Sequence, residues 1–295
     1  MMKKIFTILL LVGFLATSCN NDDDNTPSTA NLTLNLSGLE ELGTDFVYEG
    51  WIIVDGNPVS TGIFTSIIFP QSFMINVEQL ESATKFVLTI EPVNDTDPTP
   101  SNQKLMAGDF MSNVATVSTN TAPAIGDFSN SSGTFFLRTP TDEADAMNNG
   151  NDQYGVWFGF PMMPPLPNLT LPLLPEGWIY EGWVVGDSGP LSTGTFSTFD
   201  VMDNNAGLIS SFGETGRLGP QIPGEDFFLN APLGETFPLD IRGRTIVISI
   251  EPVPDNSSSP FLLKPLVGMA GNDLAPTSYD FNLNLDSFPT GTVTR

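Results

Sequence analysis

Four glutamates recur in matching contexts along this chain and are its best candidates for chemistry. Glu49 and Glu181 each precede a Gly-Trp pair, and Glu91 and Glu251 each stand directly before a proline. A carboxylate can act as a general acid or base, bind a hard cation such as calcium, or accept hydrogen bonds within the fold. Because each context occurs twice, we favour structural roles for all four. Glu49 and Glu181 are expected to tie their strands to a backbone amide, the Trp indole or a basic side chain, and Glu91 and Glu251 to cap the loops that follow them.

Composition excludes most other chemistry. The chain has 295 residues, no His and a single Cys, Cys19, which rules out Ser-His-Asp and Cys-His catalysis and zinc sites built from Cys or His. With 34 acidic against 10 basic residues, its formal charge is -24. Nucleic acid is not an expected partner, because phosphate binding depends on clustered Lys and Arg. We assign no catalytic residue, no metal site and no cofactor, and predict that the protein is not an enzyme.

Two further segments offer weaker signals. The runs Asp142–Asp145 and Asn148–Asp152 carry oxygen ligands of the kind that calcium prefers, but they lack the spacing of an EF-hand, so we favour a solvated loop. The aromatic run Tyr154–Phe160, with Met162–Pro165 after it, is apolar on both faces. That pattern favours core packing over a glycan-binding platform.

The first nineteen residues predict export. Two lysines precede an apolar run over residues 5–16, and Cys19 follows three residues later. A run of about a dozen apolar residues is shorter than the about 20 that span a bilayer, and it fits a signal peptide. The segment resembles the lipobox of bacterial lipoproteins, in which Cys19 would carry a diacylglyceryl group. Ala16 stands where that pattern usually has Leu, and plain secretion after cleavage is the alternative.

We therefore assign residues 1–18 to a lipoprotein signal peptide and 19–30 to the lipidated Cys19 and an acidic tether. Loss of residues 1–18 leaves 8 basic and 34 acidic side chains, a formal charge of -26. The acidic run Asp22–Asp24 resembles the surface-export signal of some Gram-negative lipoproteins. We predict an outer-membrane lipoprotein at the cell surface, held by its lipid anchor, with a periplasm-facing anchor as the alternative.

The rest of the chain contains two copies of one module. We place the first module at residues 31–128 and the second module at 129–295, with its repeat core from 168. The offset between the copies rises from 132 to 160, so the second copy gains 28 residues within about 203–239. We expect this insertion to be a surface loop that carries specificity. The recurring blocks are Asn31–Leu34 and Asn168–Leu171, Tyr48–Ile53 and Tyr180–Val185, Asp55–Phe64 and Asp187–Phe196, Ile90–Val93 and Ile250–Val253, and Met106–Gly108 and Met269–Gly271.

Both copies are predicted to be all β. Residues 31–36 alternate between apolar and polar side chains, as in a strand with one buried face. Residues 46–54 are apolar on both faces, which is typical of a central strand covered on both sides. No stretch has the pattern of an amphipathic helix, and two tandem β-sandwiches or partly open barrels are the economical architecture. Further strands are expected at 58–65, 86–90, 134–138 and 154–160, the last two as the leading hairpin of the second module.

The order of the repeated blocks resembles the C-terminal extracytoplasmic domain of anti-sigma-K factors, over about residues 31–110 and 168–271. That family commonly has Gln where this chain has Glu49 and Glu181. Its cytoplasmic sigma-binding region and transmembrane helix are replaced here by Cys19 and the tether. The resemblance therefore implies the fold and an envelope setting, without anti-sigma activity. The motif positions, to which we assign structural roles, are Tyr48, Glu49, Trp51, Pro58, Gly62, Glu91, Tyr180, Glu181, Trp183, Pro190, Gly194 and Glu251.

These features predict a non-enzymatic cell-envelope lipoprotein with a binding, adhesion or sensing role, whose partner is an envelope protein or a glycan. One alternative is an architectural protein that assembles with copies of itself. The other is a glycan-processing enzyme that uses two carboxylates.

Overall fold

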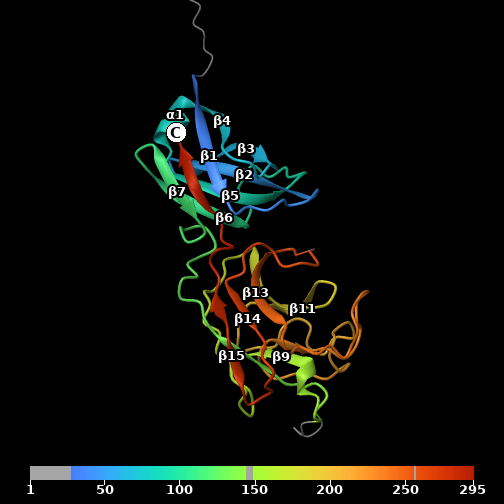
Figure 1. Ribbon diagram of the computed structural model, residues 1–295. Coiled ribbons are helices and arrows are strands. Elements are labelled where there is room, and N and C mark those ends of the chain that lie inside the picture. The colour runs from blue at the N-terminus through green and yellow to red at the C-terminus, as the bar shows by residue number, and fades with distance from the viewer. Residues whose placement is uncertain (1–27, 144–148, 256) are drawn as a thin grey trace, which may run out of the picture.

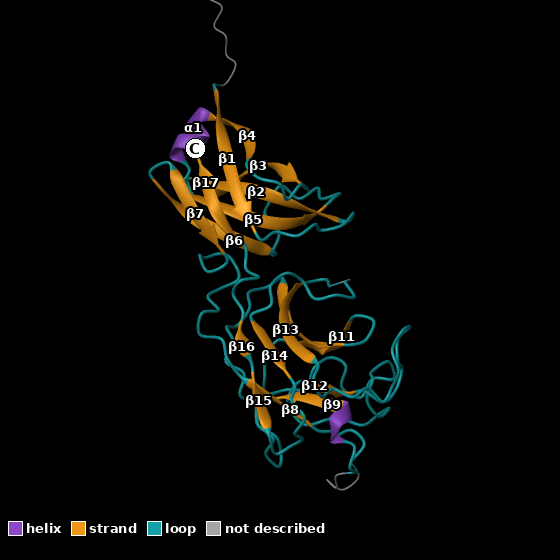
Figure 2. Ribbon diagram, viewed as in Figure 1, coloured by secondary structure: helices purple, strands orange, loops and turns teal. Residues whose placement is uncertain are grey.

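The computed structural model describes residues 28–143, 149–255 and 257–295. Cys19 and the signal peptide lie outside the described residues, as do Asp145 and Asn148 of the candidate calcium runs. The described part of the chain is almost entirely β, which confirms the predicted fold class (Figure 2). Its helices are all too short to cross a membrane.

The strands of the first module are β1 (Thr29–Ser37), β2 (Phe46–Val54), β3 (Asn57–Phe64), β4 (Gln71–Asn76), β5 (Lys85–Pro92), β6 (Lys104–Met111) and β7 (Val114–Ser118), with the short helix α1 (Val77–Ser82) after β4. The second module contains β8 (Thr134–Leu137), η2 (Asp152–Tyr154), β9 (Gly155–Phe158), β10 (Trp178–Val185), β11 (Pro190–Phe196), β12 (Gly224–Asp226), β13 (Thr245–Pro252), β14 (Leu266–Met269), β15 (Ser278–Asp280), β16 (Asn282–Leu283) and β17 (Thr290–Thr294).

An eight-stranded antiparallel sheet, the first barrel, closes almost completely and forms the upper body in Figure 1. Its strand order is β3-β2-β5-β6-β7-β17-β1-β4, and its end strands β3 and β4 contact each other. β2 is buried on both faces, as predicted: Tyr48 and Ile52 join the main core, whereas Trp51 packs outside the sheet against Val87 and Ala124. α1 was not expected; Asn76 caps it by accepting a hydrogen bond from the Gln79 amide.

The eighth strand of the first barrel comes from the end of the chain. β17 lies between β1 and β7, and its Val293 is fully buried opposite Leu34 and Ala115. Figure 1 shows the C-terminus in the upper body, beside strands of the first module. Arg295 then donates to the carbonyl of Ala83 just past α1 (2.6 Å). The second module as we divided the chain, 129–295, thus contributes its last strand to the barrel of the first.

The remaining strands form a sheet pair that repeats the topology of the first barrel. One sheet has the order β11-β10-β13-β14-β16 and the other β12-β9-β8-β15. β15 and β16 are separated only by Phe281, so one bent segment joins the two sheets. β8 occupies the place that β17 has in the first barrel, and β9 and β12 occupy those of β1 and β4. The predicted hairpin of β8 and β9 is present.

Two details of the predicted duplication differ from the structure. Residues 168–171, matched by sequence to β1, form only an isolated bridge from Thr170 to Ser132; prolines flank this segment, and proline cannot donate to a ladder. The insertion is not a surface loop. It contains β12, and it buries Ile222, Phe227 and Leu239 completely or nearly so.

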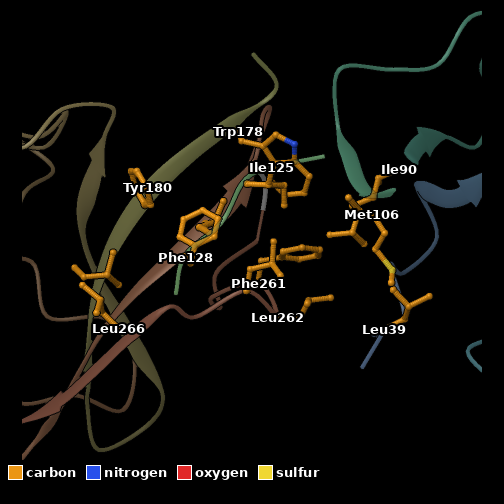
Figure 3. Packing of buried hydrophobic residues seen from close by; sticks show 14 of the residues in the cluster. Leu39, Ile90, Met106, Ile125, Phe128, Trp178, Tyr180, Phe261, Leu262 and Leu266 are labelled. Atoms are coloured by element: carbon orange, nitrogen blue, oxygen red, sulfur yellow. The ribbon is translucent and has the colours of Figure 1, made fainter. Parts of the chain in front are cut away.

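The hydrophobic core continues from one module into the other. Figure 3 shows Leu39, Ile90 and Met106 of the first module facing Phe261 and Leu262 of the second, with Ile125 and Phe128 of the connecting segment beside them. Trp178 packs against Phe261, with ring centroids 6.0 Å apart. The Gln103 side chain also donates to the Val253 carbonyl across the junction.

Candidate functional site

The repeated Ser-Thr-Gly sequence forms a β-bulge in both modules. Gly62 faces Gly50 and Ser60 faces Trp51, so Thr61 is an extra residue in β3. The same bulge places Thr193 opposite the Gly182–Trp183 step. A Cβ on Gly182 would lie 2.3 Å from Thr193 Oγ1, and Gly194 has a φ of 111°. The repeated glycines are therefore required by close approach and by backbone conformation.

A hydrogen-bonded chain joins the repeated Trp to the second repeated Glu. Trp51 Nε1 donates to Thr89 Oγ1 (2.9 Å), and Thr89 donates to Glu91. The Glu91 carboxylate also accepts from the Ser101 amide (2.9 Å), which caps the loop after β5. In the second module the corresponding bonds run from Trp183 to Ser249 (2.7 Å), from Ser249 to Glu251, and from the Phe261 amide to Glu251 (3.0 Å).

The first repeated Glu is held by the bulge. Ser60 Oγ donates to Glu49, and Ser192 Oγ donates to Glu181. The serine hydroxyl in turn accepts from the amide of Gly62 or Gly194. The sequence predicted that a backbone amide, an indole or a basic side chain would bind these carboxylates, whereas the donor is a hydroxyl.

Tyr and Pro complete the motif. The Tyr48 hydroxyl donates to the Glu40 carbonyl (2.8 Å), and that of Tyr180 donates to the Pro172 carbonyl (2.7 Å). Pro58 is the second residue of β3 and Pro190 is the first residue of β11. Each of these strands lies at the end of its sheet's strand order, where a missing N–H is tolerated. The structure thus gives each motif residue a contact or position within the scaffold.

The two copies differ in how tightly they enclose their acidic groups. In the second module, Glu181, Glu251 and Asp255 place one carboxylate oxygen each within 4.8 Å of one another. Burial raises the pKa of Glu181 to about 8 and that of Glu251 to about 7. In the first module the matching Glu49 is half-buried and Asp95 is exposed.

The insertion contains buried carboxylates that sequence reasoning missed. Asp226 is fully buried and accepts from Trp157 Nε1 (2.9 Å) and from the Thr141 amide (2.7 Å). Glu225 accepts from the Asp226 amide, and Asp203 accepts from the Gly224 amide (2.9 Å). Burial raises the pKa of Glu225 to about 8, of Asp226 to about 7 and of Asp203 to about 6. Asp226 therefore attaches the insertion to Trp157 and Thr141, whereas the hydrogen bonds of Glu225 and Asp203 lie within the insertion.

The described residues of the candidate calcium runs and of the aromatic run Tyr154–Phe160 have mainly structural contacts. Glu143 forms an ion pair with Arg138 (2.6 Å), and Asp152 accepts from Thr139. Within the aromatic run, Trp157 and Phe158 are buried as expected, whereas Phe160 at its end is 46% exposed.

Comparison of the chain with known protein families, curated proteins and solved structures found no match. The resemblance to the anti-sigma-K extracytoplasmic domain therefore stays a prediction.

Proposed function

We propose that this protein is a non-enzymatic outer-membrane lipoprotein that binds an envelope protein or a glycan. The observation that carries the anchoring is the position of Cys19, the chain's only cysteine, directly after a basic start and an apolar run. An acidic tether then leads to Thr29, where the first strand of the first barrel begins.

The contacts of the motif carboxylates support a structural role for these residues over a catalytic one. Glu49, Glu91, Glu181 and Glu251 each accept a hydrogen bond from a serine or threonine on a neighbouring strand or on their own strand. These bonds are repeated in both modules, as expected of a scaffold. A glycosidase instead needs an acid pair on either side of a substrate cleft.

A groove at the junction of the modules is the best candidate for the binding surface. It has a volume of about 580 Å³ and is lined by residues 40–46 on one side and by 251–255 and 257–261, apart from Ser258, on the other. Ligand sites commonly have volumes of about 300–1,000 Å³. Leu42 supplies an apolar side chain to it, and Phe46 lies nearby on the same wall.

Anchoring is tested by labelling with radioactive palmitate and by membrane fractionation in a Gram-negative host. We expect the unaltered chain to incorporate label and to fractionate with the outer membrane, and Cys19→Ser to lose both properties. Equal fractionation of the two chains without labelling would overturn the lipid anchor.

Binding is tested by capture from envelope extract with residues 20–295 as bait. Leu42→Arg in the groove should abolish capture, whereas Ile209→Arg, in the exposed part of the insertion, should leave it unchanged. Loss of capture with Ile209→Arg alone would move the site to the insertion. Self-association without any captured partner would favour an architectural role.

A further inference from the structure

Three carboxylates from separate parts of the second module meet outside the sheet that contains β10 and β13. Glu181 lies on β10, Glu251 lies near the end of β13, and Asp255 belongs to the following loop. Glu181 is 5% exposed and Glu251 is 0% exposed, while Asp255 is half-buried. Across the described ranges, none of the three forms a salt bridge with Lys or Arg.

Glu181 provides an independent sign that a ligand is needed. Its Oε1 accepts from Ser192, but its Oε2 is buried and accepts from no residue outside the three carboxylates. The Asp255 carboxyl, which also carries acceptor oxygens, lies within hydrogen-bond reach of the Glu181 carboxyl. A buried carboxylate in such close contact with a second carboxylate needs a shared proton or a cation between the two.

We propose that Glu181, Glu251 and Asp255 bind a calcium ion. Calcium takes oxygen ligands at about 2.3–2.6 Å, so two ligands of one ion lie at most about 5 Å apart. The separation of 4.8 Å or less between the three carboxylate oxygens meets that condition. Calcium also tolerates irregular ligand geometry, whereas magnesium demands a near-ideal octahedron. Backbone carbonyls or water would complete the coordination.

The site is open to solvent on one side. Glu251 and Asp255 line the groove between the modules, which gives an ion a route to the carboxylates. Lys264 is the nearby basic group, and its positive charge opposes the binding of a cation. Its ammonium group donates to the Phe261 carbonyl. The negative charge of Glu40 partly offsets that of Lys264.

The first module supplies a matched comparison. Glu49, Glu91 and Asp95 occupy the corresponding positions, but among the described residues they do not form a group as close as that of the second module. They line a separate hollow of about 440 Å³. We therefore expect a single calcium site per chain, in the second module.

Calorimetric titration of the chain from residue 20 to 295, freed of metal with EDTA, tests the proposal. At pH 7.5 and about 0.1 M salt, where exposed charges are largely screened, CaCl₂ should bind with a stoichiometry near one and raise the Tm. Glu181→Gln and Asp255→Asn should each weaken binding at least tenfold. The matched variants Glu49→Gln and Asp95→Asn should bind as the unaltered chain does.

Either of two results would overturn the calcium site. One is the absence of binding heat and of any Tm shift in the unaltered chain at pH 7.5, which would assign a shared proton to the cluster. The other is unchanged calcium affinity in Asp255→Asn. Because Asp255 lies in a loop, that variant keeps the test decisive even if Glu181→Gln fails to fold.

Discussion

Buried carboxylates dominate the chemistry of this chain at the scale of single residues. Asp226 and Glu251 are completely buried, and Glu225 is 4% exposed. Such groups are tolerated because each accepts hydrogen bonds from backbone amides, hydroxyls or an indole. The hydrogen bonds favour the charged form, yet burial has the larger effect on the pKa of Asp226, Glu225 and Glu251. The folded state consequently holds protons more tightly than the unfolded state does.

We predict that the protein is less stable at pH 8 than at pH 5. The pKa is raised to about 8 for Glu225 and to about 7 for Asp226, so their stabilisation is fully present below their unfolded values near 4 and is lost as pH rises to about 8. Each pKa unit corresponds to about 1.4 kcal/mol, and a total loss of a few kcal/mol is expected. Urea unfolding in EDTA measures it.

Substitution of Glu225 isolates its share of this pH dependence. Glu225→Gln keeps an acceptor oxygen but cannot ionise, so the difference in unfolding free energy between pH 5 and pH 8 should shrink. Glu214→Gln, at an exposed position of the same insertion, is the control and should leave the difference unchanged. Equal stability of the unaltered chain at both pH values would contradict the assignment.

Gly182 offers a second test at residue scale. A Cβ there would lie 2.3 Å from Thr193 Oγ1 and 2.4 Å from a ring carbon of Phe158, both in fully buried side chains. Gly182→Ala should therefore reduce the free energy of unfolding by about 1–3 kcal/mol, the usual cost of overpacking. Chemical denaturation measures this, and a loss below about 0.5 kcal/mol would mean that the bulge relaxes.

At the scale of elements, β17 is the strand on which the first barrel depends. It is the only strand between β1 and β7, and Arg295 stacks over the Phe110 ring at 4.6 Å. Deletion of residues 290–295 should expose the backbone groups of β1 and β7. Hydrogen exchange should rise at least tenfold in these two strands and much less in β10 and β13. Equal protection of β1 and β7 in the unaltered chain and in the chain that lacks residues 290–295 would contradict this dependence.

The insertion is a second element whose removal should be harmful. Deletion of residues 204–231 removes β12 and with it Asp226, which links Trp157 to Thr141. We expect the sheet pair to lose Phe227 from its core and the chain to lose several kcal/mol of stability. Thermal denaturation of the two chains measures the effect, and an unchanged Tm would restore the surface-loop interpretation.

The sequence pattern predicted those strands whose own side chains show which of their faces are buried. β2 was predicted with its observed bounds because it is apolar on both faces, and the repeated Tyr, Trp and Gly positions indicated the duplication. β17 could not be found in this way, since Val293 is its only fully buried side chain and its partners are far away in sequence. The grouping of Asp255 with Glu181 likewise depends on a loop path that no local pattern encodes.

At the scale of the whole molecule, the chain crosses between its two halves twice. It leaves the first barrel after β7 and returns with β17. The core is continuous across the junction, where Phe261 and Leu262 of the second module face Met106 and Leu39 of the first (Figure 3). Two chain crossings and a shared core couple the stability of one half to that of the other.

This coupling predicts a single cooperative unfolding transition in scanning calorimetry, with equal calorimetric and van't Hoff enthalpies. Phe261→Ala, at the junction, should cost about 3–5 kcal/mol and split the transition into two. Phe136→Ala, in a small separate cluster with Trp157 and Ile222, should lower the Tm by a similar amount while keeping one transition. Two resolved transitions in the unaltered chain would show that the barrel and the sheet pair unfold independently, despite the strand and the core that they share.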